Sequence, residues 1–248
     1  MDIKKLVFDL VGCKFTGSVE EIATTDLIVK FDGQSAVIGS NSIPAKARGY
    51  MLLAKAVAEG KTLDITQKPA FKTIGVMLDV SRGGVMKVSS VKKYIDYMVA
   101  HGMNMLMLYT EDVYEVDGYP YFGYQRGRYT LKELQEIDNY AFDLGVEVIP
   151  CIQTFGHMEQ FLRYPSSSDV KDSASVLLAG EEKTYDLIRA CIATCRKAFR
   201  SNRLHIGCDE TRGLGLGEYL NRHGYQDRFT IFNSHIQRVT EICKEYNY

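Results

Sequence analysis

The chain has 248 residues, of which 46% are hydrophobic and 25% charged, and its formal net charge is −1. This composition is typical of a globular protein of one or two domains, and it gives no sign of nucleic acid or an anionic membrane as partner. No stretch approaches the roughly 20 apolar residues that span a bilayer. The first residues, MDIKKLVFDLVG, lack a signal-peptide cleavage site, so we expect a cytoplasmic protein.

Residues 1–70 are predicted to form a small α/β accessory domain. Its β-rich stretches are Lys5–Val11, Leu27–Phe31 and Ser35–Gly39. The turn residues Asp32 and Gly33 predict a hairpin between the last two of these. A helix is predicted over Ile43–Glu59 because apolar residues recur there at helical spacing, and Gly60 ends it. The boundary to a second domain, residues 71–248, is placed within 66–72.

From residue 71 onward, strands and helices alternate. The predicted strands are Ile74–Asp79, Met103–Tyr109, Val146–Ile152 and Leu204–Ile206. Ser89 or Ser90 is expected to cap the first helix, and the capping box Thr130–Glu133 opens the second. A third helix is predicted over 181–199. The apolar face of the last helix is assigned to Phe229, Phe232, Ile236, Val239 and Cys243.

Strands that are apolar on both faces and separated by helices indicate a parallel sheet and the α/β fold class. The polar clusters follow the strand ends: Asp79 with Arg82, Glu111 with Asp112, His157, and Asp209 with Glu210. Enzymes with a (β/α)8 barrel place their active sites at this edge, and so do doubly wound open sheets. No glycine-rich phosphate-binding fingerprint is present, because Gly213–Gly217 has the wrong spacing and is expected to be a mobile loop.

Asp209 and Glu210 follow a short apolar strand and are the first candidates for catalysis. Carboxylates at the mouth of a buried strand are costly unless they are paired, hydrogen-bonded or used. A carboxyl group beside an ionised one in a partly dry cleft keeps its proton to higher pH, which suits a general acid. The structural alternative is a pair of acids that decorates a helix N-terminus.

Three motifs in chain order carry a resemblance to a known family. They are Ile74–Arg82 (IGVMLDVSR), Phe155-Gly-His157 and His205–Glu210 (HIGCDE). Together they resemble glycoside hydrolase family 20, the exo-acting β-N-acetylhexosaminidases, over about residues 27–210. The resemblance implies a small α/β domain followed by a (β/α)8 catalytic barrel, a glycan carrying terminal β-linked N-acetylglucosamine or N-acetylgalactosamine as substrate, and no cofactor.

The resemblance also implies a role for each candidate residue. In this family the 2-acetamido oxygen of the substrate attacks C1, so no protein nucleophile is needed. Glu210 would be the general acid and then the base, and Asp209 would hold the acetamido nitrogen. His157 matches a histidine close to the acid, although a structural role is the alternative for a single histidine.

The remaining candidates depart from the family pattern. Ile74 stands where the family usually has an arginine that grips sugar hydroxyls. Asp79 and Arg82 fit a structural ion pair as well as a sugar contact. Glu111 corresponds loosely to a sugar-binding aspartate, with an exposed loop acid as the alternative. Gln153 replaces an aspartate, which weakens any relay from His157.

The largest departure is length. Only four strand–helix units are predicted, whereas a barrel has eight. The chain also has no tryptophan, the residue that lines the sugar-binding site in this family. We therefore expect the first half of a (β/α) barrel, truncated after the fourth unit. A second hypothesis is a non-catalytic half barrel that binds sugar weakly or forms a homo-oligomer to cover its open edges.

A metal-dependent hydrolase is a third and weaker hypothesis. It would use His157 and His205 with Asp209 and Glu210, but His205 is expected to face the core or a helix. The six cysteines are expected to be reduced, small apolar residues. Cys191 and Cys195 could share a helix face, but two further ligands are missing there, so no metal site is predicted.

Overall fold

A computed structural model describes all residues of the chain, 1–248. The chain divides into two compact units. The first comprises Met1–Val76, Lys87–Leu106 and Ile137–Val148, and the second comprises Met77–Met86, Met107–Glu136 and Ile149–Tyr248. None of the helices is both long and apolar enough to cross a membrane. The domain boundary placed near residue 70 stays a prediction.

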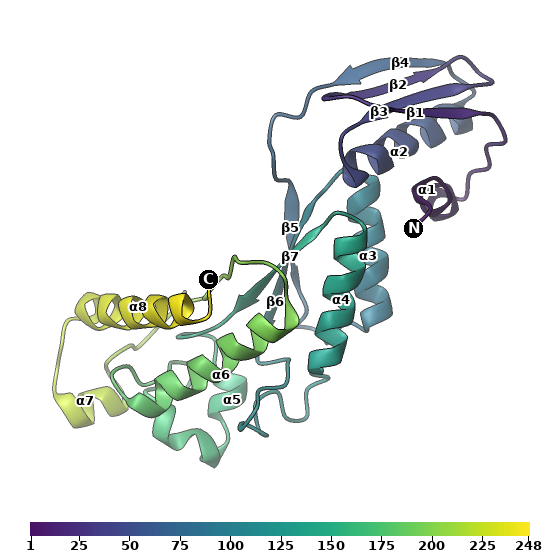
Figure 1. Cartoon of the computed structure of the whole chain (residues 1–248). Helices are drawn as coiled ribbons and strands as arrows, with labels where there is room; N and C mark the ends of the chain where they lie inside the picture. Colours follow the sequence, from purple (N-terminus) through teal and green to yellow (C-terminus); the bar gives the residue numbers. More distant parts are fainter. The chain divides into compact units, whose positions relative to one another are not determined.

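The first unit contains a four-stranded mixed sheet in the order β1-β3-β2-β4. Its strands are β1 (Val19–Ala23), β2 (Leu27–Phe31), β3 (Ala36–Ser40) and β4 (Leu63–Gln67). The predicted β2–β3 hairpin is confirmed, since Asp32 accepts hydrogen bonds from the N–H groups of Gln34 and Ser35 in its turn. Strands β1 and β4 were not predicted. Helix α2 (Ile43–Glu59), predicted with the same bounds, covers one face of this sheet (Figure 1).

The first predicted strand, Lys5–Val11, is wrong. This stretch belongs to helix α1 (Ile3–Val11). The Asp2 side chain caps it by accepting from the N–H of Lys5, and Gly12 ends it with a left-handed backbone. Ile3, Val7 and Phe8 lie on the buried face, where the ring of Phe8 meets Tyr50 of α2 edge-on. Packing of this helical stripe outweighs the β-propensity of the Leu-Val-Phe run.

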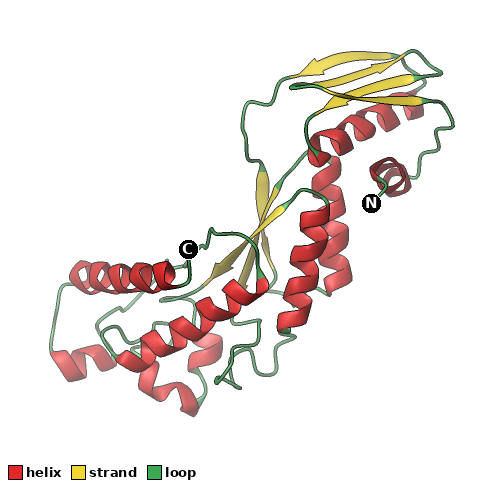
Figure 2. Ribbon diagram, in the orientation of Figure 1, coloured by secondary structure: helices red, strands yellow, loops and turns green.

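The second sheet is parallel and has the order β5-β6-β7 (Figure 2). Strands β5 (Gly75–Asp79), β6 (Met105–Glu111) and β7 (Glu147–Ile152) are the predicted ones. The fourth predicted strand is reduced to one parallel bridge between Cys151 and His205. It continues in the hydrogen bond from the Thr154 N–H to the Gly207 carbonyl. The Leu204–Ile206 segment therefore runs beside β7 as predicted, but its paired stretch is too short to form a strand.

The helices between these strands begin partly as predicted. Helix α4 (Leu131–Asp143) opens with the predicted capping box, in which Thr130 and Glu133 exchange side chain-to-backbone hydrogen bonds. The predicted caps of α3 (Val88–Ala100), Ser89 and Ser90, are wrong. That helix begins after Lys87 without a side-chain cap.

The second unit holds the remaining helices: α5 (Glu159–Leu162), the 3-10 helix η1 (Pro165–Val170), α6 (Glu182–Ala198), α7 (Glu218–His223) and α8 (Arg228–Glu245). Helices α6 and α8 pack against each other. The predicted face of α8 is partly wrong, because Phe229 is 62% exposed and the buried positions include Ile231 and His235. All six cysteines are free thiols.

Candidate active site

The carboxyl ends of β6, β7 and the Leu204–Ile206 segment bring the predicted residues together in the second unit. His157 Nε2 lies 3.2 Å from Asp209 Oδ2 and 3.7 Å from Glu210 Oε2. The next helix, α7, begins only at Glu218, so the two acids do not decorate a helix N-terminus. The imidazole therefore stands within reach of both carboxylates.

The backbone is unusual at these positions. Glu111, His157 and Glu210 all have a left-handed backbone, with φ of 44°, 54° and 50°. Residues with side chains adopt this conformation at a cost of about 1–2 kcal/mol each. Such strain collects at functional sites, where the surrounding structure holds a side chain in a direction that ordinary extended or helical backbone would not give.

Two glycines permit the close approach of the strand ends. A Cβ on Gly156 would lie 2.3 Å from the Asp209 carbonyl oxygen, and one on Gly207 would lie 2.2 Å from the Ile152 carbonyl oxygen. Gly156 thus lets the Phe-Gly-His turn touch the Asp209 backbone. Gly207, with φ of 54°, turns the chain away from β7 just before the acids.

Asp209 is held by two neighbours. Gln153, which is 1% exposed, donates from Nε2 to Asp209 Oδ1 at 3.3 Å, and His157 contacts the other oxygen. Partial burial acts to raise the Asp209 pKa, but hydrogen bonds from its own backbone and Gln153 and the nearby imidazole outweigh it and hold the pKa below the usual value. The carboxyl group is therefore ionised at neutral pH, even though Gln153 replaces an acid.

Glu111 is a buried acid and not an exposed loop residue. It is 4% exposed and accepts a hydrogen bond from the Tyr109 hydroxyl at 3.1 Å. Burial raises the Glu111 pKa, and the bond from Tyr109 and the charges of Arg82 and Arg126 counteract this only in part. Tyr109 also accepts from Gln153 Nε2 at 2.9 Å. The Tyr109 hydroxyl and the Gln153 amide thus connect Glu111 to Asp209.

Asp79 and Arg82 form an ion pair at the end of β5. Arg82 Nε lies 2.9 Å from Asp79 Oδ2, and the other Asp79 oxygen accepts from the N–H and hydroxyl of Ser81. Burial acts to raise the Asp79 pKa, but the Ser81 bonds and Arg82 lower it overall. Arg82 Nε also lies 3.6 Å from Glu111 Oε1, so the pair borders the site.

A cavity of about 420 Å³ lies over these groups. Its lining comprises Arg82, Glu111, His157, Glu159, Ser175, Glu210 and Arg212. The sequence did not single out Glu159, Ser175 or Arg212. The only signal for Arg212 was its place two residues after Glu210. Oppositely charged groups around a cavity of this size suit a polar ligand with several hydroxyl and amide groups.

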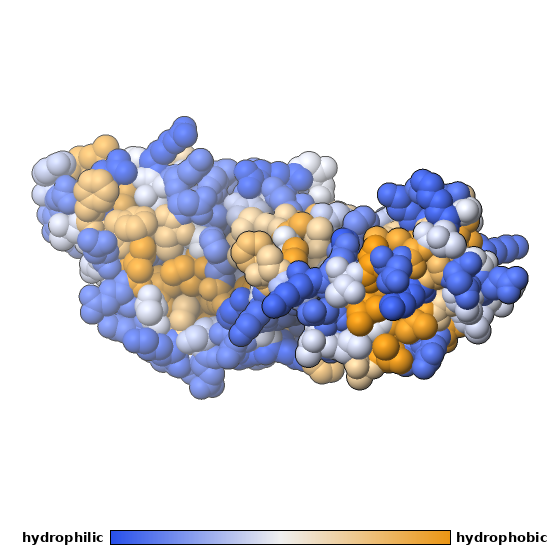
Figure 3. Space-filling model, turned by 90° about the horizontal axis from the view of Figure 1, so that it is seen from above, coloured by the Kyte–Doolittle hydropathy of each residue, from blue (hydrophilic) through white to orange (hydrophobic).

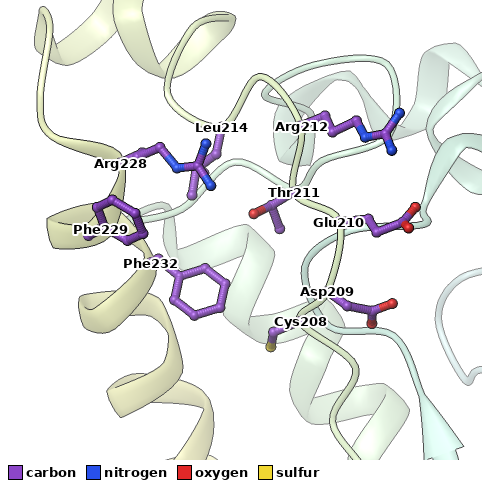
Figure 4. Close-up of a pocket in the computed structure, with 9 residues that line it drawn as sticks. All are labelled: Cys208, Asp209, Glu210, Thr211, Arg212, Leu214, Arg228, Phe229 and Phe232. Carbon is purple, nitrogen blue, oxygen red and sulfur yellow. The ribbon is translucent and has the colours of Figure 1, made fainter.

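A second cavity, of about 290 Å³, lies on the other side of the segment that carries the acids. Figure 4 shows that Asp209, Glu210 and Arg212 point away from Phe229 and Phe232 of α8. The two aromatic rings border the apolar side of this cavity. Glu210 and Arg212 line both cavities, whereas Asp209 lines the second one, so the two cavities share the backbone segment that carries the acids.

His235 supports the site from α8 and was not found by sequence analysis. It is fully buried, its Nε2 lies 2.9 Å from the Thr154 carbonyl, and its ring stacks on Phe155 at 3.8 Å between centroids. Burial lowers the His235 pKa to about 4, so the ring is neutral at pH 7 and donates from Nε2. It thereby fixes the turn that carries His157.

His205 is exposed, contrary to the expectation that it faces the core or a helix. Its backbone pairs with β7 at Cys151, and it is absent from the lining of the cavity beside His157 and Glu210. No group of three or more His, Cys, Asp or Glu side chains is arranged to hold a metal ion.

The chain is similar in sequence to known proteins over much of its length. The human protein named hexosaminidase D is 32% identical over 176 residues, which cover 68% of this chain and 36% of the relative. Beta-hexosaminidase 3 of Arabidopsis thaliana is 24% identical over 202 residues, 75% of this chain and 37% of the relative. The chain thus spans less than half the length of these curated relatives.

Solved structures show the same fold. One described as a glycoside hydrolase family 20 β-N-acetylglucosaminidase superposes with a TM-score of 0.77 at 21% identity, covering 99% of this chain and 58% of that one. A β-N-acetylhexosaminidase from Streptomyces coelicolor gives a TM-score of 0.75 with the same coverage and identity. Residues 71–247 match the sequence model of the glycosyl hydrolase family 20 catalytic domain, and the chain therefore belongs to glycosyl hydrolase family 20.

Proposed function

We propose that the cluster of His157, Asp209 and Glu210 is the catalytic centre of a β-N-acetylhexosaminidase that releases terminal N-acetylglucosamine or N-acetylgalactosamine from a glycan. The observation that supports this most is the imidazole nitrogen within 3.7 Å of both neighbouring carboxylates, in a chain of family 20. Because Asp209 and Glu210 are consecutive, neither stands across the sugar as a protein nucleophile. The substrate supplies the nucleophile itself.

In the first step, the acetamido oxygen attacks C1 while the bond from C1 to the glycosidic oxygen breaks. Glu210 gives its proton to that leaving oxygen. Asp209 accepts a hydrogen bond from the acetamido N–H and stabilises the positive charge that develops on the oxazolinium ring. The lowered pKa of Asp209 serves this role, since the group must be ionised to act.

In the second step, Glu210 takes a proton from water and the water oxygen attacks C1. The ring opens, and the acetamido group and the β-configuration are restored. Glu210 thus acts as acid and then as base. His157 orients both carboxylates. Gln153 donates hydrogen bonds to Asp209 and to the Tyr109 hydroxyl, and this hydroxyl donates to Glu111, so the positions of the two acids are linked. Glu111 and Arg82 line the cavity and are placed to bind hydroxyl groups of the sugar, and Asp79 holds Arg82 through their ion pair.

The test is hydrolysis of 4-nitrophenyl N-acetyl-β-glucosaminide by the 248-residue chain and by the chain extended to a whole barrel. Glu210→Gln should lower kcat at least about 1,000-fold and Asp209→Asn about 100-fold, whereas Glu241→Gln, an exposed acid on α8, should change nothing. The 4-nitrophenyl β-glucoside, which lacks the acetamido group, should not be cleaved. Near-normal turnover by Glu210→Gln would remove the assignment.

A second proposal concerns the chain taken alone, as a half barrel that self-associates. The apolar cavity beside α8 favours it, because Phe229, which lines this cavity, is 62% exposed, and Leu216 outside the cavity is equally exposed. Figure 3 shows hydrophobic side chains gathered in the part of the view where α8 lies in Figure 1. The Leu204–Ile206 segment also lies at the edge of its sheet. An uncovered apolar flank and an open sheet edge both promote association.

Light scattering on the purified chain tests this association. A dimer that dissociates in the Phe229→Asp variant is expected, with Phe142→Asp, another exposed phenylalanine, as the control that leaves it intact. A monomer at concentrations of about 100 μM would contradict this second proposal without touching the catalytic one.

A further inference from the structure

The loop that follows Glu210 turns several times before helix α7 begins. Glu210, Gly213 and Gly215 have a left-handed backbone, with φ of 50°, 75° and 75°. Within the loop, the Leu214 N–H donates to the Thr211 carbonyl at 3.2 Å. Leu214 and Gly215 are buried, and a buried backbone N–H without an acceptor is costly. The loop therefore depends on acceptors from another part of the chain.

Asp172 supplies these acceptors and is itself only 5% exposed. One of its carboxylate oxygens accepts from the Gly215 N–H and the other from the Tyr219 N–H, each at 2.8 Å. Its carbonyl oxygen accepts from the Glu218 N–H at 2.9 Å. A Cβ on Gly217 would lie 1.9 Å from that carbonyl oxygen, so the approach requires glycine. Hydrogen bonds to a carboxylate are roughly twice as strong as those between neutral groups, so Asp172 anchors the end of the loop.

The segment around Asp172 also holds the turn that carries the histidine of the site. The Met158 N–H donates to the Ser175 carbonyl at 3.1 Å, and the Leu177 N–H donates to the Phe155 carbonyl at 3.0 Å. The histidine turn and the loop after the acids are therefore both fastened to one short piece of chain.

Glu210 depends on this anchoring more than Asp209 does. The Asp209 oxygens are held by Gln153 and His157. The Glu210 side chain is 59% exposed, and its carboxylate lies 3.7 Å from the His157 imidazole, beyond hydrogen-bonding distance. The direction of Glu210 is thus set mainly by its backbone, whose carbonyl accepts from the Arg212 N–H in the loop at 2.7 Å. The position of the loop determines where this carboxyl group lies.

We propose that Asp172 is a positioning residue for Glu210, and that by anchoring the loop 211–217 it keeps the Glu210 proton within reach of the leaving glycosidic oxygen. Both anchored parts border the same cavity, because Ser175 lies in the Asp172 segment and Arg212 in the loop. Asp172 does not line this cavity, so it acts only through the loop. The inference rests on the proposed function, since it concerns the acid of that reaction. A displacement of about 1 Å at a reacting group can cost about 100-fold in rate.

The test compares two substrates whose leaving groups need the acid to different degrees. 2,4-Dinitrophenolate leaves without a proton, whereas 4-methoxyphenolate leaves slowly unless Glu210 protonates its oxygen. Asp172→Asn should lower kcat/KM about 10-fold to 100-fold for the 4-methoxyphenyl N-acetyl-β-glucosaminide and less than about threefold for the 2,4-dinitrophenyl one. The ratio kcat/KM is used because it covers only the steps up to loss of the leaving group. Both the 248-residue chain and the chain extended to a whole barrel are assayed.

Three further variants separate positioning from folding. Asp169→Asn changes an exposed aspartate that pairs with Lys183, and it should leave both rates unchanged. Glu210→Gln should show the same dependence on the leaving group as Asp172→Asn, with larger losses. Asp172→Ala, which removes both acceptor oxygens, should exceed Asp172→Asn in its effect. Circular dichroism melting verifies that each variant folds.

Hydrogen exchange of the 248-residue chain, followed by NMR, gives a readout that needs no turnover. Asp172→Asn should speed exchange of the Gly215 and Tyr219 amides, and also that of Arg212, whose N–H bonds to the Glu210 carbonyl. Faster exchange at Gly215 and Tyr219 alone would overturn the inference, because the end of the loop would then move without the acid.

The outcomes distinguish this inference from the proposed function. Equal losses on the two substrates in Asp172→Asn would mean a purely structural role and overturn the inference, and so would unchanged rates. Normal turnover of both substrates by Glu210→Gln would overturn the proposed function. The exchange measurement would then still decide whether Asp172 fixes the backbone at Glu210.

Discussion

The four-stranded sheet of the first unit and the carboxyl edge of β5-β6-β7 in the second unit differ in which residue types adopt a left-handed backbone, with positive φ. Before residue 70, the positions with positive φ are all glycines, Gly12, Gly33 and Gly60, and each has open space where a Cβ would be. At the carboxyl edge, Glu111, His157 and Glu210 adopt it with full side chains.

The carboxyl edge of the second sheet also contains buried polar atoms that lack a hydrogen-bond partner. Gln153 Oε1 is among them, and it lies at the end of β7 in the second unit. Such atoms usually cost about 1–3 kcal/mol each. One region is thus built for stability, with conventional turns and caps, whereas the other stores strain and unsatisfied polar groups around a cavity. This difference is expected where side chains must be held ready for a ligand.

The largest effect should come from comparing Gly207→Ala with Gly60→Ala. Both glycines have left-handed backbones, with φ of 54° and 63°, but only at Gly207 would the new Cβ meet a carbonyl oxygen, at 2.2 Å. We expect Gly207→Ala to lower the free energy of unfolding by about 3–4 kcal/mol and Gly60→Ala by about 1 kcal/mol. Urea denaturation measures both, and equal losses would show that close approach plays no part.

The second effect concerns pH. The His235 pKa is lowered from 6.5 to about 4, mainly by burial, so the unfolded chain binds a proton that the folded one does not. The stabilisation is complete above pH 6.5 and decreases as the pH falls towards 4, by roughly 3 kcal/mol for this group. His235→Gln should remove that component from the pH dependence of stability. His101→Gln, in the first unit, is the control, and identical pH profiles for wild type and His235→Gln would refute the assignment.

A smaller effect is expected at Gln153. Gln153→Leu removes the donor to Asp209 and Tyr109, so the Asp209 pKa should rise and the acid limb of the activity profile should move to higher pH. Stability should change by only about 1 kcal/mol, because one buried oxygen without a partner is removed as well. Gln135→Leu, whose amide donates to the Lys197 carbonyl outside the site, should leave the limb in place. If the acid limb of the pH–activity profile shifted equally in Gln153→Leu and Gln135→Leu, Gln153 would have no specific role in positioning Asp209.

The smallest effect compares the helix caps of the two regions. Thr130→Ala breaks a capping box with two reciprocal bonds, whereas Ser42→Ala breaks a single bond of 3.3 Å at the start of α2. We expect losses of about 1 and about 0.5 kcal/mol in thermal or urea unfolding. The reverse order would mean that the box contributes less than its geometry indicates.

Much of the fold was predictable because several elements carry strong local signals. Helix α2 has an N-cap serine and a terminal glycine, and the three strands of the parallel sheet are nearly continuous apolar runs. Helix α1 was missed because a short Leu-Val-Phe run satisfies either period, and only packing on α2 favours the helical one. Strand β4 was missed because its alternating residues depend on pairing with β2.

The sequence alone determined the alternation of strands and helices from β5 to β7, the edge at which the polar residues collect, and the position of the candidate acids at 209 and 210. Those features depend on local spacing and on motifs, which are readable in one dimension. Only the tertiary structure decided that Glu111 is buried, that Gln153 and Tyr109 connect it to Asp209, and that His235 holds the His157 turn from a helix about 80 positions away. Burial and hydrogen bonding between distant segments arise from packing, so no local pattern could have specified them.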